Sequence, residues 1–127
     1  MIFFVDDDKL IINLLEYTFK NRKNYKVKCF FTGEECLEHL HENPSLVVLD
    51  HCFSKAGSAN LTGLQTLERI MKQKQDIPVI MLSSQDNKEL IPRFIEAGAR
   101  RYISKDDYFI DSLMEAIDAE LAAGSGH

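Results

Sequence analysis

Short apolar segments alternate with longer amphipathic segments along this chain. Five of the short segments are typical of strands, because they are brief apolar or alternating runs bounded by turn residues. They are residues 2–5, 26–31, 46–50, 78–82 and 101–104. The segments that follow them carry apolar residues at helical spacing, as in Leu64, Leu67, Ile70 and Met71. The pattern therefore predicts five strand–helix units.

Strands that alternate with helices favour a parallel sheet covered on both faces. Right-handed crossovers restrict the topology, and the order 2-1-3-4-5 brings the first and third strands together where the strand order reverses. We therefore predict an α/β fold, a single doubly wound domain of the flavodoxin-like type with helices on both faces. The domain is expected to span residues 1–122, with residues 123–127 as a linker or appended tail.

Individual residues predict where two of the helices begin. The first helix is expected to be capped by Asp7 or Asp8, whose carboxylates can accept hydrogen bonds from the first turn. The helix after the fourth strand contains Pro92, which lacks a backbone N–H. Its hydrogen-bonded part is therefore expected to begin near Lys88 or Glu89.

Composition argues against several classes of function. The 127 residues are 45% hydrophobic, as in globular proteins, with a net charge of −5 and no block of Lys or Arg. Nucleic-acid binding is not expected, because it needs clustered positive charge. No apolar run approaches the ~20 residues of a membrane span, and no signal peptide is expected before the first strand. The three cysteines predict reduced thiols of a cytoplasmic protein. Cys36, His39 and His41 have a spacing that is poor for zinc.

Polar side chains that could take part in binding or catalysis come directly after the strands. In chain order they are Asp6, Asp7, Asp8, Asp50, Ser83 and Lys105. The carboxyl ends of parallel strands meet at one edge of a sheet, where ligands bind. Several carboxylates at that edge repel one another, and a hard divalent cation removes this cost. We therefore expect Mg²⁺, or Mn²⁺ in its place, at this edge.

An ionised carboxylate beside a metal can itself be a nucleophile. Aspartate has an ordinary pKa of about 3.9 and needs no general base at neutral pH. Ser83 and Lys105 offer a hydroxyl and a positive charge to an anion next to the metal, as phosphoryl groups require. The predicted chemistry is phosphoryl transfer onto Asp50.

With these residues in place, the chain resembles the receiver domains of two-component response regulators, including the chemotaxis type. The resemblance covers Met1 to about Ala122. It rests on Val5-Asp6-Asp7, Val48-Leu49-Asp50, Ser83-Ser84, Glu96-Ala97-Gly98-Ala99 and Tyr102-Ile103-Ser104-Lys105, in the order and spacing of the family. That family shares the 2-1-3-4-5 strand order, so the predicted order is not independent of the resemblance.

The resemblance implies a role for residues at this edge. Asp6, Asp7 and Asp50 would bind the metal, and the backbone carbonyl of Cys52 would complete its site. Asp50 would accept the phosphoryl group from a sensor histidine kinase or a phosphotransfer protein, and Lys105 would bind the phosphate. The chain would then be a phosphoacceptor signalling domain rather than an enzyme, although one that assists its own phosphorylation and dephosphorylation.

The resemblance also implies a switch. Ser83 would move toward the phosphate, and Tyr102 would fill the space that it leaves. The face formed by the fourth helix, fifth strand and fifth helix would then control an output domain or partner protein, or pair two copies as a homodimer. Cys52 and Gln85 stand at the positions that tune the lifetime of the phosphate.

The chain departs from the family pattern in two loops. The Met-Pro turn expected after Asp50 is missing, and the loop from His51 to Thr62 is longer than usual. We expect this loop to be mobile and to act as a partner or access element, with a tolerated surface insertion as an equal alternative. Asp106 replaces the usual proline, so the Lys105–Asp106 peptide bond is expected to be trans.

Two enzyme or cofactor functions compete with this interpretation. Asp6-x-Asp8 also resembles the nucleophile motif of haloacid-dehalogenase-like phosphatases, with Asp6 as nucleophile. That motif expects Thr or Val where Leu10 stands, and it leaves Asp50 without a role. A flavin-binding domain of the same fold would need a phosphate-cradling loop after the first strand, and none is present.

Overall fold

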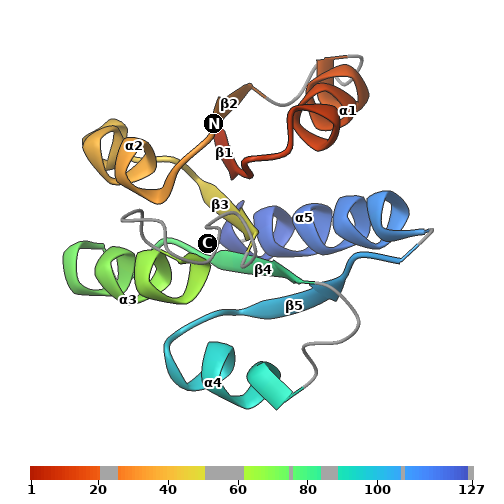
Figure 1. Ribbon diagram of the computed structural model, residues 1–127. Helices are drawn as coiled ribbons and strands as arrows, with labels where there is room; N and C mark the ends of the chain where they lie inside the picture. The colour runs from red at the N-terminus through yellow and green to blue at the C-terminus, as the bar shows by residue number, and fades with distance from the viewer. Residues whose placement is uncertain (21–25, 51–61, 75, 84–88, 107, 126–127) are drawn as a thin grey trace.

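Five parallel strands form one sheet in this computed structural model, which describes residues 1–20, 26–50, 62–74, 76–83, 89–106 and 108–125. The strands are β1 (Ile2–Val5), β2 (Val27–Phe30), β3 (Leu46–Asp50), β4 (Val79–Ser83) and β5 (Arg101–Ser104). Their order is β2-β1-β3-β4-β5, and each neighbouring pair is parallel (Figure 1). The predicted fold class and strand order are therefore confirmed.

Helices cover both faces of the sheet. They are α1 (Lys9–Lys20), α2 (Gly33–Glu38), the 3₁₀ helix η1 (Leu40–Glu42), α3 (Gly63–Gln73), α4 (Ile91–Glu96) and α5 (Phe109–Ser125). Side chains of α1 and α5 share one core cluster, and those of α2, η1, α3 and α4 share the other. Alternate strand residues divide between the two clusters, because successive side chains of a strand point to opposite faces. None of the helices in the described ranges is long and apolar enough to cross a membrane.

The first helix begins at one of its predicted caps. Asp8 Oδ1 accepts a hydrogen bond from the Leu10 backbone N–H at 2.9 Å. The side chains of α1 that are fully buried are Ile12, Leu15 and Phe19. Leu14, which shares the same helical periodicity in the sequence, is 43% exposed. Packing against the sheet thus buries the stripe that contains Ile12, Leu15 and Phe19 and leaves the side chain of Leu14 partly in solvent.

The helical stretch after β4 begins close to the predicted position. α4 starts at Ile91, and Leu90 is its N-cap residue without a side-chain cap bond. Pro92 lies in the first turn, where the missing N–H would have no intrahelical partner in any case. Glu89 and Leu90 already form a 3₁₀ turn in front of α4, which agrees with the expected start near Glu89, whereas Lys88 lies outside the described residues.

Two cysteines are free thiols in the described part of the chain, and of these Cys36 is buried and Cys29 is half-buried. Neither Cys29 nor Cys36 forms a disulfide there. Burial raises the pKa of each thiol to about 12, and a hydrogen bond with Glu16 contributes for Cys29. Both thiols therefore stay protonated at neutral pH and are poor nucleophiles.

A turn at Gly98 connects α4 to β5. The Gly98 N–H donates to the carbonyl of Ile95 at 3.1 Å, and the Ala99 N–H donates to that of Phe94 at 2.9 Å. These two bonds form a Schellman motif, which needs a positive φ at the glycine, and Gly98 has φ of 117°. A Cβ atom there would lie 2.7 Å from Cγ and Sδ of Met71. The backbone conformation favours glycine, and a larger residue would also have to displace the Met71 side chain.

Replacing Gly98 by alanine should lower the free energy of unfolding by about 1–3 kcal/mol, because the substitution adds strain at positive φ and a close contact. Urea unfolding followed by circular dichroism measures the loss. The same substitution made in Met71→Ala protein provides the control, since the contact is then relieved and the backbone strain remains. A loss below about 0.5 kcal/mol in otherwise wild-type protein would contradict this explanation.

Candidate functional site

Three carboxylates meet at the carboxyl edge of the sheet. Asp50 ends β3, and Asp6 directly follows β1, whose Val5 is paired with Leu49 of β3. Asp6 and Asp50 are only 1% and 2% exposed, whereas the adjacent Asp7 is exposed. Carboxylate oxygens of the three aspartates all lie within 4.8 Å of one another. The strand order therefore brings together residues that the sequence separates.

Lys105 directly follows β5, an edge strand of the sheet, and contacts both buried carboxylates. Its Nζ lies 2.9 Å from Asp50 Oδ1 and 3.1 Å from Asp6 Oδ2. Burial opposes the charge of this ammonium, but the two carboxylates outweigh burial and raise the pKa of Lys105 above its ordinary 10.5. The Lys105–Asp106 peptide bond is trans, as predicted.

Asp6 is also oriented by its own backbone. The Asp8 N–H donates to Asp6 Oδ1 at 3.0 Å, while Lys105 donates to Asp6 Oδ2. The sequence analysis did not predict this contact between Asp8 and Asp6. The spacing of an aspartate two residues before the donor is typical of an Asx turn and could have indicated it.

Ser83 and Tyr102 lie on one face of neighbouring strands. Ser83 ends β4 and is buried, and it is paired with Ser104 of β5, while Tyr102 is paired with Met81 of β4. Paired residues of a parallel sheet share a face, so Ser83 and Tyr102 are offset by two residues on that face. The Tyr102 ring stacks on Phe94 of α4 with a centroid separation of 6.1 Å.

The remaining predicted site residues lie outside the described ranges. Cys52 and Gln85, expected to complete the metal site or tune phosphate lifetime, are among them. The same holds for residues 51–61 of the long loop. Their predicted roles stay predictions.

The donor set suits a hard divalent cation. Mg²⁺ prefers oxygen ligands and keeps several of its waters, so a few carboxylates are enough to hold it. Asp6, Asp7 and Asp50 supply such oxygens within 4.8 Å of one another. The single positive charge of Lys105 is smaller than their combined negative charge, so a further cation would be attracted. These carboxylates could hold a metal ion.

Comparison with known proteins identifies the family. A family model described as the response regulator receiver domain matches residues 2–118. The chain belongs to this family. One curated relative is the alkaline phosphatase synthesis transcriptional regulatory protein PhoP of Bacillus subtilis (strain 168), which is 33% identical over 105 residues. The match covers 82% of this chain and 41% of PhoP, so the chain spans less than half of that relative.

Solved structures of other receiver proteins share the fold. The receiver domain of NtrX from Brucella abortus is 29% identical and has a TM-score of 0.84, with 96% of this chain and 98% of that chain covered. DrrB of Thermotoga maritima, an OmpR/PhoB homologue, is 27% identical with a TM-score of 0.80, covering 97% of this chain and 52% of its own. The resemblance stated from the sequence is thus confirmed: this is a receiver domain of the two-component response regulators.

Replacing Lys105 by methionine should destabilise the metal-free receiver domain, because Asp6 and Asp50 would be left buried without the ammonium. We expect the free energy of unfolding to fall by about 3 kcal/mol at neutral pH. The loss should shrink as the pH approaches about 4, because protonation then removes the uncompensated charges. Urea unfolding in the presence of a chelator, repeated at several pH values, measures both effects.

The raised pKa of Lys105 determines how its contribution to the free energy of unfolding changes at alkaline pH. A group with a raised pKa contributes its stability below its unfolded value and loses it only as the pH rises through the folded one. The difference between wild-type and variant should therefore be constant from about pH 6 to about pH 9. Lys72→Met, at an exposed position of α3, is the matched control. A loss that grows on acidification would show that the carboxylates do not depend on Lys105.

Proposed function

We propose that Asp50 accepts a phosphoryl group in a Mg²⁺-dependent reaction and that this modification controls an output. The observation that carries the proposal is the setting of Asp50. It is a buried carboxylate at the end of β3, 2.9 Å from the Lys105 ammonium and grouped with two further carboxylates. Membership of the receiver family supports the same chemistry.

In the proposed reaction, an oxygen of Asp50 attacks the phosphorus of a phosphohistidine on a sensor kinase or phosphotransfer protein. The new O–P bond forms as the P–N bond breaks, and the histidine leaves with the electron pair. Asp50 needs no base, since a carboxylate is ionised at neutral pH. Mg²⁺ held by Asp6, Asp7 and Asp50 would neutralise charge on the transferred group.

The other residues at this edge would act on the phosphoryl oxygens. The ammonium of Lys105 already contacts an Asp50 oxygen, so a small rotation would bring it to an oxygen of the phosphoryl group. Ser83, on the neighbouring strand β4, would donate its hydroxyl to another. These residues hold and orient the group, whereas the bond is formed by Asp50.

The signal would leave the site through β5. As Ser83 moves toward the phosphate, Tyr102 would rotate into the vacated space on the face of the sheet that both residues share. The stack of Tyr102 on Phe94 would carry that movement to α4. Coupling of this kind is typically worth ~1–3 kcal/mol, which biases an equilibrium rather than locking it.

The proposed partners follow from the family. A sensor histidine kinase or phosphotransfer protein would supply the phosphoryl group, and an output domain or partner protein, or a second copy in a homodimer, would receive the signal. PhoP is a transcriptional regulatory protein, and DrrB is an OmpR/PhoB homologue. We propose a comparable arrangement, in which this receiver domain governs an output outside the matched region.

Incubation with acetyl phosphate and Mg²⁺ should add one phosphoryl group, and Asp50→Asn should abolish the addition, because Asp50 is the proposed nucleophile. Intact-protein mass spectrometry measures the adduct, and a chelator in place of Mg²⁺ should suppress it. Labelling that persists in Asp50→Asn but disappears in Asp6→Asn would instead favour a phosphatase-like nucleophile at Asp6.

Beryllofluoride with Mg²⁺ should shift the amide signals around Tyr102 and Phe94, because it mimics the phosphoryl group at Asp50 without turnover. The shifts at these two residues should be reduced in Ser83→Ala protein, since the hydroxyl that moves toward the mimic is missing. Ser45→Ala, at an exposed position before β3, is the control. Unmoved signals at Tyr102 and Phe94 in wild-type protein would exclude this route.

A further inference from the structure

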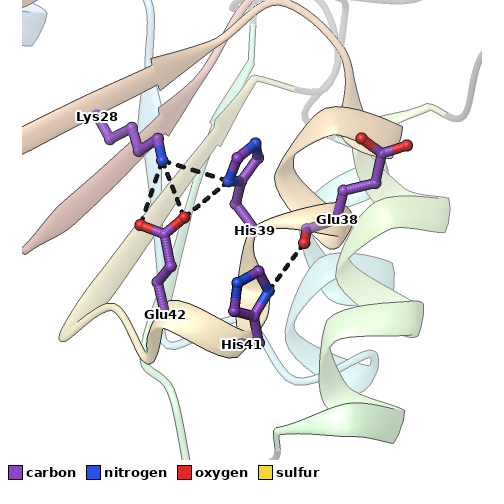
Figure 2. Close-up of polar contacts among 5 residues, drawn as sticks. All are labelled: Lys28, Glu38, His39, His41 and Glu42. Carbon is purple, nitrogen blue, oxygen red and sulfur yellow. Dashed lines mark hydrogen bonds and ion pairs between the residues drawn. The ribbon is translucent and has the colours of Figure 1, made fainter.

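A polar cluster lies away from the aspartate site, where β2 meets the segment of α2 and η1 (Figure 2). Lys28 of β2 donates to both carboxylate oxygens of Glu42 in η1, at 3.2 and 2.9 Å. His39, the C-cap residue of α2, places Nδ1 2.7 Å from Glu42 Oε2 and 3.2 Å from Lys28 Nζ. Lys28 and His39 therefore meet at the same oxygen of Glu42.

The chemistry of the partners fixes the proton on His39. A carboxylate only accepts hydrogen bonds, so the 2.7 Å contact requires the proton on Nδ1 of His39. An ammonium only donates, so the Lys28 contact at 3.2 Å then brings two donors together. Lys28 and His39 consequently compete for Glu42, and Nε2 is the nitrogen of His39 that gains a proton in acid.

The other groups around His39 do not supply a second carboxylate for it or for Lys28 in the contacts described. His41 Nδ1 donates to the backbone carbonyl of Glu38, and its ring stacks on His39 at 6.3 Å. Phe30 of β2 contacts the His39 ring at a centroid distance of 5.2 Å. Figure 2 shows the Glu38 carboxylate turned away from the cluster. The charged or titratable side chains that contact His39 in the described part of the chain are Lys28, Glu42 and His41.

Glu42 keeps its charge while the histidines titrate. Hydrogen bonds from Lys28, and then from His39, hold the pKa of Glu42 below its ordinary 4.5. The carboxylate therefore remains ionised throughout the range in which imidazoles gain a proton.

We propose that protonation of His39 transfers Glu42 from Lys28 to His39 and thereby loosens the link between β2 and the α2–η1 segment. An imidazolium makes a stronger, charge-assisted bond to the carboxylate and repels the adjacent ammonium. Lys28 is the partner that can yield, because its side chain is long and lies on another element, whereas His39 and Glu42 are three residues apart in one segment.

The exchange removes a contact between two elements and keeps the existing contact within one segment. Lys28 and Glu42 are 14 residues apart, on β2 and η1, whereas His39 and Glu42 are three apart in one segment. Acid would therefore weaken the Lys28–Glu42 contact between the two elements and keep the His39–Glu42 contact within one segment.

A double-mutant cycle between Lys28→Met and Glu42→Gln, followed by urea unfolding, tests the exchange. Both side chains are partly exposed, so the variants are expected to fold. The coupling factor in the unfolding equilibrium should fall about twofold from about pH 8 to about pH 5.5. In a His39→Gln background the factor should be the same at both pH values, and in His41→Gln it should behave as in the wild type.

The opposite results would overturn the proposal. A coupling factor that does not change with pH, or a pH dependence that survives in His39→Gln, would show that His39 does not control the Lys28–Glu42 contact. A pH dependence lost in His41→Gln would assign the effect to His41. Long-range proton–nitrogen spectra give a second check, because a His39 ring protonated on Nε2 alone at about pH 8 would contradict the competition.

Discussion

Two carboxylates buried side by side are the constraint on which this structure depends. Asp6 and Asp50 are almost fully buried at the ends of neighbouring strands, an arrangement that is unfavourable without a positive charge between them. Lys105 provides that charge from a position 99 residues after Asp6. The residues that follow β1 and β5, the first and last strands along the chain, are therefore joined by an ion pair.

The position of Lys105 depends on features that lie far from the carboxylates. β5 begins three residues after Gly98, and the positive φ at that glycine turns the chain from α4 into the strand. The Lys105 N–H then donates to the Ser83 carbonyl at 2.9 Å, which extends the β4–β5 pairing by one residue. A backbone turn at the opposite edge of the sheet thus helps to set where the ammonium lies.

Much of this arrangement is predictable because burial on both faces leaves a plain signal in sequence. β1, β3 and β4 consist entirely of buried residues, so their apolar runs end where the chain emerges. The polar residues that follow such runs must lie at one edge, which is why the sequence alone suffices to group Asp6, Asp50 and Ser83.

The parts that sequence did not predict depend on contacts between elements. The periodicity of α1 allows more than one apolar stripe, and only the sheet decides that Leu14 stays exposed. The Lys28–Glu42 contact joins two elements through charged residues, which have no periodic pattern to indicate their pairing.

The ion pairs of Lys105 with Asp6 and Asp50 also suggest why β5 would carry a signal in the proposed mechanism. In the proposed reaction, the negative charge of Asp50 moves outward onto the phosphoryl oxygens, so the most favourable position of the Lys105 ammonium moves with it. Lys105 directly follows the strand that contains Tyr102, and both lie next to β4, which contains Ser83. In the proposed mechanism, a change of charge at Asp50 would therefore act on β5 by two routes, the ammonium and the serine. Because the Tyr102 ring packs on Phe94, that strand can convert a local electrostatic change into a change of packing at α4.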